Sequence, residues 1–199
     1  MKLFFIFLFV TSSWASDFLP RSFSFNFEQR FISKINKKEK ISSGTLDYLY
    51  PGNIRFEILN PDKVIFVSNN EKSWYYTGPF IEGEEGELTV KSNDKKMVLA
   101  KFFDSLGKGL SSNDVYKVES TKDGKKLIFS DVSKSDLGIK EAFLYLENAK
   151  SDFKSLSKVL INYSDDRQTT FTVKSMKTEL GWNKNHFIFN PPPKTKISN

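Results

Sequence analysis

The chain of 199 residues contains no cysteine and a single histidine, His186. The absence of cysteine excludes a disulfide framework, a thiolate nucleophile and a lipid-acceptor cysteine behind an export signal, so we do not expect a surface-anchored lipoprotein. One histidine without cysteine cannot build a Cys/His nucleophile pair or a histidine-rich metal site. We therefore interpret His186 as a structural residue and expect neither an enzyme nor a protein with a metal or another cofactor.

Motifs for phosphate, metal or nucleic-acid binding are also missing. Gly107-Lys108-Gly109 follows a predicted helix and lacks the spacing of a phosphate-binding loop. An acidic cluster consists of Glu82, Glu84, Glu85 and Glu87. The cluster lacks the Asp-rich pattern of a calcium loop, and its glycines indicate a solvated hairpin. The net charge of +6 comes from scattered lysines. We expect no nucleic-acid partner, because such binding favours a concentrated basic face with stacking aromatics.

Long apolar runs are confined to the start of the chain. Residues 3–10 are continuously apolar after Lys2, and Ser13-Trp14-Ala15 supplies small residues near a cleavage point. This pattern predicts a secretory signal peptide over residues 1–15. No later stretch approaches the roughly 20 apolar residues of a transmembrane helix. We expect a single domain over residues 16–199, a net charge of +5 once Lys2 is removed, and a location in the periplasm of a Gram-negative bacterium, with full secretion as the alternative.

Short runs of alternating residues dominate the remainder of the sequence. Ile54, Phe56 and Ile58 alternate with polar residues, and Tyr50-Pro51-Gly52-Asn53 is typical of a tight turn between strands. Asp123-Gly124 is a strong signal for a two-residue hairpin. About eleven strands are predicted, within residues 22–35, 44–58, 63–68, 73–77, 87–92, 115–119, 126–130, 139–147, 156–163, 169–176 and 187–190.

One segment, residues 97–110, has helical spacing instead. Its apolar residues are Leu99, Phe102, Phe103, Leu106 and Leu110. Gly107 and Gly109 supply breakers at its end. The fold class that follows is mainly β with minor α: a curled antiparallel sheet that forms an incomplete, half β-barrel, with a helical lid over its concave apolar face.

A concave apolar face of this kind is a candidate binding site. We predict that the sheet side of the site consists of Leu46, Tyr48, Ile54, Phe56, Ile58, Phe66, Trp74 and Tyr76, and that the lid contributes Leu99, Phe102, Phe103 and Leu106. Plain core packing is the alternative for each of the helical residues. Both interpretations hold together if the helix fills the concavity when it is empty and lines it when it is occupied.

The order and spacing of several short motifs resemble a known family. The motifs are Gly44-Thr45-Leu46, Tyr50-Pro51, Pro61-Asp62, Phe66-Val67-Ser68, Trp74-Tyr75-Tyr76 and, far downstream, residues 187–192 with the sequence FIFNPP. Over about residues 27–197 the chain resembles LolA, the periplasmic carrier family for outer-membrane lipoproteins. The resemblance implies an incomplete antiparallel barrel closed by helices, and acyl chains of lipoproteins as cargo.

The resemblance also implies partners and a closing mechanism. Acylated lipoproteins would come from an inner-membrane ATP-driven transporter and pass to the outer membrane, where an acceptor is possible; we expect a monomer. Family members typically carry an arginine before the proline of the second strand pair, which latches the lid. Tyr50 occupies that position here, so we predict Tyr50 as the latch, with fewer donors than a guanidinium. The N-terminal lid helix looks truncated or absent.

Two other functions stay open at this stage. The first is a periplasmic carrier or binding protein for another lipid, such as a glycolipid or a free acyl lipid, because any acyl chain presents the same CH₂ surface. The second is an enzyme, or a structural or polysaccharide-binding module, on a similar scaffold.

Overall fold

A twelve-stranded sheet forms the body of the computed structural model, which describes residues 18–33, 37–81, 83–92, 97–147 and 152–198. The strands are β1 (Ser22–Ile32), β2 (Glu39–Leu49), β3 (Asn53–Asn60), β4 (Val64–Ser68), β5 (Lys72–Thr77), β6 (Gly86–Ser92), β7 (Tyr116–Thr121), β8 (Gly124–Phe129), β9 (Ile139–Leu146), β10 (Leu156–Tyr163), β11 (Gln168–Thr178) and β12 (Thr195–Ser198). The predicted signal peptide lies outside the described residues.

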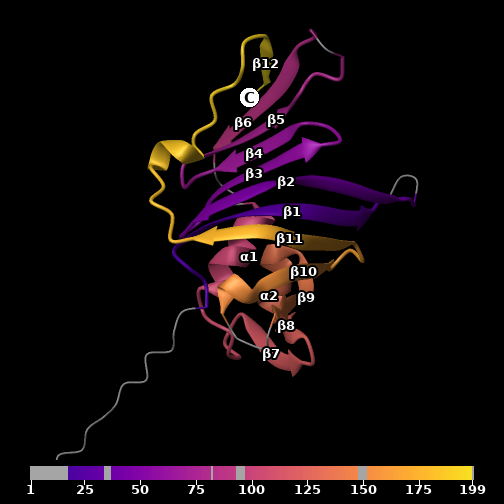
Figure 1. Ribbon diagram of the computed structural model, residues 1–199, viewed down its shortest axis with the longest axis vertical. Helices are drawn as coiled ribbons and strands as arrows, with labels where there is room; N and C mark the ends of the chain where they lie inside the picture. Colours follow the sequence, from indigo (N-terminus) through magenta and orange to yellow (C-terminus); the bar gives the residue numbers. More distant parts are fainter. Residues whose placement is uncertain (1–17, 34–36, 82, 93–96, 148–151, 199) are drawn as a thin grey trace, which may run out of the picture.

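The sheet is open, and it curls around the helices (Figure 1). Its order is β12-β6-β5-β4-β3-β2-β1-β11-β10-β9-β8-β7, with β12 and β7 as the two edges. Neighbouring strands are antiparallel except for β12, which pairs parallel with β6. The predicted half-barrel of about eleven strands is confirmed.

Within the described residues, the α-helices are α1 (Val98–Leu106) and α2 (Asp131–Leu137). α1 ends four residues earlier than predicted: the Gly107 amide donates to the Asp104 carbonyl, and Gly109 adopts a left-handed conformation with φ of 81°. α2 was not predicted from the sequence. Two residues mark its ends in the sequence: Ser130 as the N-cap, and Gly138, which adopts the left-handed conformation after the last helical residue. The seven residues between them are too few to show helical periodicity.

The C-terminal segment differs most from the prediction. A strand was expected over residues 187–190, but the chain forms a short 3-10 helix, η3 (Lys184–Phe187), and then crosses the convex face of the sheet. Three successive prolines, Pro191 to Pro193, lack the amide hydrogen that a strand donates, so pairing resumes only at Thr195. A second 3-10 helix, η2 (Phe153–Ser155), precedes β10.

Hydrophobic side chains form two clusters, one on each face of the sheet. The larger fills the concave face and includes the helix residues, while the smaller covers the convex face of β4 to β6 beneath the C-terminal segment. Phe18 and Leu19, just before β1, also pack into the larger cluster, and no helix is present in residues 18–21. Strict alternation in β1 places Phe23, Phe25 and Phe27 in the larger cluster.

Gly44 is required where β2 passes β3. A Cβ atom at this position would collide with the backbone carbonyl of Glu57 on the neighbouring strand. We expect Gly44→Ala to lower the free energy of unfolding by about 2 kcal/mol or more, measured by urea denaturation, because backbone has to move. Gly181→Ala is the control, since its Cβ would meet no atom within 4 Å. Equal losses in the two variants would contradict the assignment.

Candidate functional site

The concave face of the sheet is lined with aromatic rings. Phe23 lies opposite Tyr48, and Phe25 lies opposite Leu46, on the paired strands β1 and β2. The rings of Phe27 and Phe56 stack with centroids 4.9 Å apart, and Phe171 of β11 meets Phe27 edge-on at 5.6 Å. Such a surface offers mainly apolar contact.

Six of the eight predicted sheet residues belong to this face. Leu46, Tyr48, Ile54 and Phe56 are buried members of the large cluster, and Ile58 and Phe66 pack against it partly buried. Further residues of the wall were not predicted from the sequence: Phe25, Phe27, Val159, Ile161 and Phe171. The alternation in residues 22–27 could have identified the two phenylalanines of β1.

The placement of Trp74 and Tyr76 in the concavity is corrected by the structure. Both residues belong to the convex cluster, where the Tyr76 ring lies 5.3 Å from that of Phe189. The register shows the reason: Phe66 is paired with Tyr75, so the neighbours of Tyr75 point to the opposite face. Tyr75 shares the face of Phe66.

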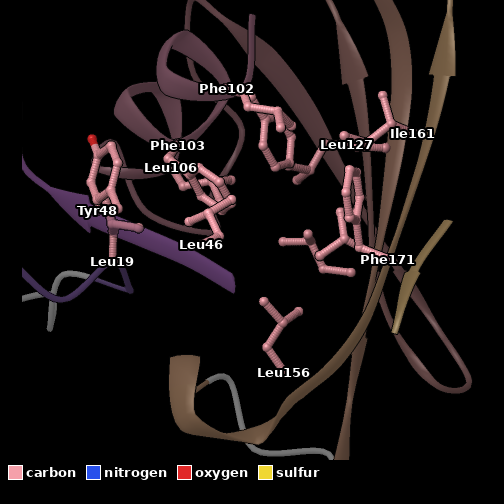
Figure 2. Close-up of a cluster of buried hydrophobic side chains, with 14 of the residues drawn as sticks. Leu19, Leu46, Tyr48, Phe102, Phe103, Leu106, Leu127, Leu156, Ile161 and Phe171 are labelled. Atoms are coloured by element: carbon pink, nitrogen blue, oxygen red, sulfur yellow. The ribbon is translucent and has the colours of Figure 1, made fainter. Parts of the chain in front are cut away.

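Helix α1 fills the concavity. Its Leu99, Phe102, Phe103 and Leu106 are all buried, and Figure 2 shows Phe102 and Phe103 directed toward Leu46, Leu127 and Phe171 of the sheet. The Phe103 and Phe23 rings approach to 5.0 Å. The space left between helix and sheet is about 10 Å³, roughly the room for one water molecule. An acyl chain can enter this part of the face only if α1 moves.

Polar contacts tie α1 to the β2–β3 turn. One oxygen of the Asp104 carboxylate accepts hydrogen bonds from the Tyr48 phenol and from the Gly52 amide, the latter at 2.8 Å. Burial, together with the neighbouring Asp104, raises the pKa of Tyr48 well above its usual range. The phenol therefore remains a donor at all physiological pH values. Asp104 thus ties the apolar lid by hydrogen bonds to β2 and to the β2–β3 turn.

A second phenol holds the end of the helix. The buried Tyr116 of β7 donates toward the backbone carbonyls of Ser105 at 3.0 Å and Gly109 at 2.6 Å. The Ser105 carbonyl belongs to the last turn of α1, where carbonyl groups lack partners within the helix, and the Gly109 carbonyl lies in the turn that follows. Burial raises the pKa of Tyr116 as well. The lid is thus attached at its C-terminal end to both halves of the sheet.

An open groove continues the concave face beyond the lid. Its volume is about 380 Å³, and its lining consists of Phe31, Lys40, Ile41, Ser42, Ile58, Pro61, Asp62 and Val64. This volume is within the usual range of about 300–1,000 Å³ for ligand sites. Ile58 borders both the groove and the large cluster, so the groove adjoins the apolar face beneath α1.

Groups for catalysis or metal binding do not gather in this site. Across the described ranges, no cluster of three potential metal ligands occurs. His186 lies on the convex side, where its Nε2 is 2.7 Å from the Asp47 carboxylate and its ring stacks on Trp182. This contact anchors the C-terminal segment to β2, a structural role.

Comparison with protein families decides the classification. The family model described as "Outer membrane lipoprotein carrier protein LolA" matches residues 20–190. The chain belongs to the LolA family. The family model describes a carrier, in agreement with the expectation that this LolA-family protein is not an enzyme.

Individual relatives of this LolA-family chain are distant. An outer-membrane lipoprotein carrier protein of Pseudoalteromonas translucida is 24% identical over 182 residues, which are 89% of this chain and 80% of the relative. A protein of the same name from Idiomarina loihiensis is 36% identical over 62 residues, 31% of this chain and 30% of the relative. An uncharacterized conserved protein from Thermus thermophilus aligns with a TM-score of 0.49 and 12% identity, covering 90% of this chain and 92% of the other.

Tyr50, predicted as the latch in place of the family arginine, does not tie the lid by a hydrogen bond. Its side chain is 46% exposed and its ring lies against Gly107, and its hydroxyl has no hydrogen-bond partner among the described residues. The expectation for Tyr50 is therefore corrected: Tyr48 and Tyr116 are the phenols that bind α1.

None of the helices in the described ranges is long and apolar enough to cross a membrane.

The corrected role of Tyr50 gives a direct test. We expect Tyr50→Phe to leave the amide hydrogen exchange of α1 unchanged within about two-fold, because no hydrogen bond is lost. Tyr116→Phe removes two donor contacts and should accelerate exchange at the C-terminal end of α1 by about ten-fold, since a neutral hydrogen bond contributes about 1 kcal/mol. Faster exchange in Tyr50→Phe would restore the latch assignment.

Proposed function

We propose that this protein is a periplasmic carrier that binds the acyl chains of lipoproteins and takes them from the inner to the outer membrane. The observation that carries the proposal is the filled concavity. α1 places four apolar side chains against an aromatic wall, and an open groove adjoins the same face. Leu46, Tyr48, Ile54, Phe56, Ile58 and Phe66 then form the sheet side of the binding site.

The position of α1 inside the concavity explains how a carrier can release its cargo. Burying an acyl chain contributes about 0.8 kcal/mol per CH₂, so one C16 chain would contribute roughly 11 kcal/mol if fully removed from water. Several chains held this tightly would not dissociate. Because α1 already occupies the concavity, cargo must displace contacts such as that between Phe103 and Phe23, which lowers its net affinity.

The partners follow from this proposal. An inner-membrane ATP-driven transporter would supply the acylated lipoprotein, and an outer-membrane acceptor or the outer membrane itself would receive it. Residues 1–15 would direct export to the periplasm, and residues 16–199 would act as one domain and as a monomer. Membership in the LolA family supports lipoprotein as the class of cargo.

Native mass spectrometry of the protein purified from its own periplasm tests the proposal. We expect a fraction of the molecules to carry a triacylated protein or peptide, identified after organic extraction. A defined non-protein lipid in its place would show a carrier of glycolipid or free acyl lipid. A protein that carries no lipid and binds no fluorescent acyl probe would contradict both carrier functions.

A further inference from the structure

Exposed apolar side chains gather along one rim of the sheet. In an antiparallel sheet alternate strands run the same way, so β1, β3 and β5 all end at this rim, where β1 and β3 end on the right in Figure 1. The exposed residues are Ile32 (62%), Ile41 (48%), Leu59 (47%), Phe80 (95%) and Ile81 (63%). We call these five side chains the hairpin rim.

The most exposed pair projects from the connection between β5 and β6. Phe80 is almost fully exposed, and Ile81 follows it directly. At the base of this connection the Gly78 amide donates to the Lys63 carbonyl at 2.8 Å, which holds it beside the β3–β4 connection. Three adjacent hairpins thus each place apolar side chains at the same rim: Ile32 and Ile41 at the ends of β1 and β2, Leu59 at the end of β3, and Phe80 and Ile81 in the β5–β6 connection. Several exposed apolar residues in one region mark an interaction surface.

The open groove lies at this rim. Phe31 and Ile41 come from the β1–β2 hairpin, and Pro61 and Val64 come from the β3–β4 hairpin. Ile41 is both a groove residue and a member of the hairpin rim. By alternation along their strands, Ile32, Ile41 and Leu59 lie on the other face of the sheet from the groove residues Phe31, Ser42 and Ile58, so the groove and these exposed side chains meet at the edge of the sheet.

The charges near the hairpin rim are of both signs. Lys37, Lys38, Lys40 and Lys63 are exposed, and so are Glu39, Asp62, Glu84 and Glu85. A surface with this balance has little net attraction for an anionic or a cationic partner. Binding through the hairpin rim must therefore depend on its apolar side chains.

We infer that the hairpin rim docks directly on a phospholipid bilayer, with Phe80 and Ile81 inserted at the interface and the groove opening toward the lipid. The inference rests on the proposed function and adds the surface to which cargo is delivered or from which it is received. Three separate hairpins that each expose one or two apolar side chains near their ends fit a fluid interface better than a rigid protein face. Contact with the bilayer also spares the acyl chains exposure to water during transfer.

Flotation with protein-free vesicles tests the inference. Vesicles of phosphatidylcholine and phosphatidylethanolamine are mixed with the mature protein, and the bound fraction is measured after density-gradient centrifugation. We expect the wild type to float with the vesicles at low and high salt, with less than a two-fold difference. The double variant F80S/I81S should bind at least ten-fold more weakly.

The matched control is Val132→Ser, because Val132 is 82% exposed but belongs to α2, away from the hairpin rim. This variant should bind vesicles like the wild type. All three proteins should bind a fluorescent acyl probe equally without vesicles, since none of the substituted residues lines the groove or the concavity. A wild-type protein that does not bind the acyl probe would contradict the proposed function. The vesicle experiment tests only the role of the hairpin rim.

Three results would overturn the inference. The first is a wild type that does not float with vesicles. The second is an equal loss in F80S/I81S and Val132→Ser. The third is binding to bacterial membranes that disappears after protease treatment while protein-free vesicles fail to bind, which would identify a protein as the occupant of the hairpin rim.

Discussion

Replacement of Phe56 by glutamate is expected to abolish binding of a fluorescent acyl probe, with a loss of affinity of at least about 100-fold. Phe56 is 6% exposed and stacks on Phe27 in the middle of the concave wall. A carboxylate there is an unpaired charge in an apolar site, and it would be costly to bury against an acyl chain. Titration of the probe against the purified variant measures the effect.

The matched control is Phe143→Glu, the same chemical change on the other face of the sheet. Phe143 of β9 is partly exposed and lies beneath the ammonium group of Lys126, 5.0 Å from the ring centroid. A glutamate at this position would sit beside a positive charge, so probe affinity should stay within about two-fold of the wild type. Equal effects of the two glutamates would mean that the concave face does not bind the probe.

A second variant keeps the prediction testable if Phe56→Glu does not fold. Ile58 is only partly buried and lines the open groove, so the Ile58→Glu variant should fold. Its affinity for the acyl probe should still fall by about ten-fold. Circular dichroism and urea denaturation confirm folding before each titration. Probe binding at wild-type affinity by a folded Ile58→Glu variant would remove the groove from the proposed path of the acyl chain.

The sequence predicts the concave face well where the alternation is clear. Ile54, Phe56 and Ile58 are separated by Arg55 and Glu57, so the face that avoids water is visible from the residues alone. In Trp74-Tyr75-Tyr76 three aromatic residues follow one another, and alternation gives no choice of face. The C-terminal Phe187 and Phe189, more than a hundred residues away, provide the apolar cover that makes Tyr76 a buried residue of the convex side.

The attachment of the lid was less accessible to sequence analysis. The helical spacing of Leu99, Phe102 and Phe103 correctly predicts which side of α1 is buried. The hydrogen bond between Tyr48 and Asp104 joins residues 56 positions apart, and no local pattern marks such a contact. The latch role of Tyr50 follows only from the resemblance to a family arginine. In the structure the chain turns at Pro51, and the Tyr50 ring is half exposed. Polar contacts over long sequence distances depend on the completed fold.

Replacement of Asp104 by alanine is expected to open the lid and to raise acyl-probe affinity by about ten-fold or more. The change removes the acceptor for the Tyr48 phenol and the Gly52 amide, and it leaves a fully buried phenol without that partner. A hydrogen bond to a charged group contributes about 1.5–3 kcal/mol, so a loss near 3 kcal/mol corresponds to roughly 100-fold easier local opening. Cargo then displaces a helix that is held less firmly.

Hydrogen exchange and probe titration together decide this prediction. Amides of α1 should exchange about 10- to 100-fold faster in Asp104→Ala, while amides in the middle of β1 and β11 stay protected, which separates lid opening from global unfolding. Asp136→Ala is the control: Asp136 pairs with Lys101 of α1 at 2.5 Å, but its side chain is 64% exposed. An exposed ion pair contributes about 0–1 kcal/mol, so exchange and affinity should change little. If both variants behaved alike, apolar packing of Leu99, Phe102 and Phe103 would hold the lid without help from the carboxylate.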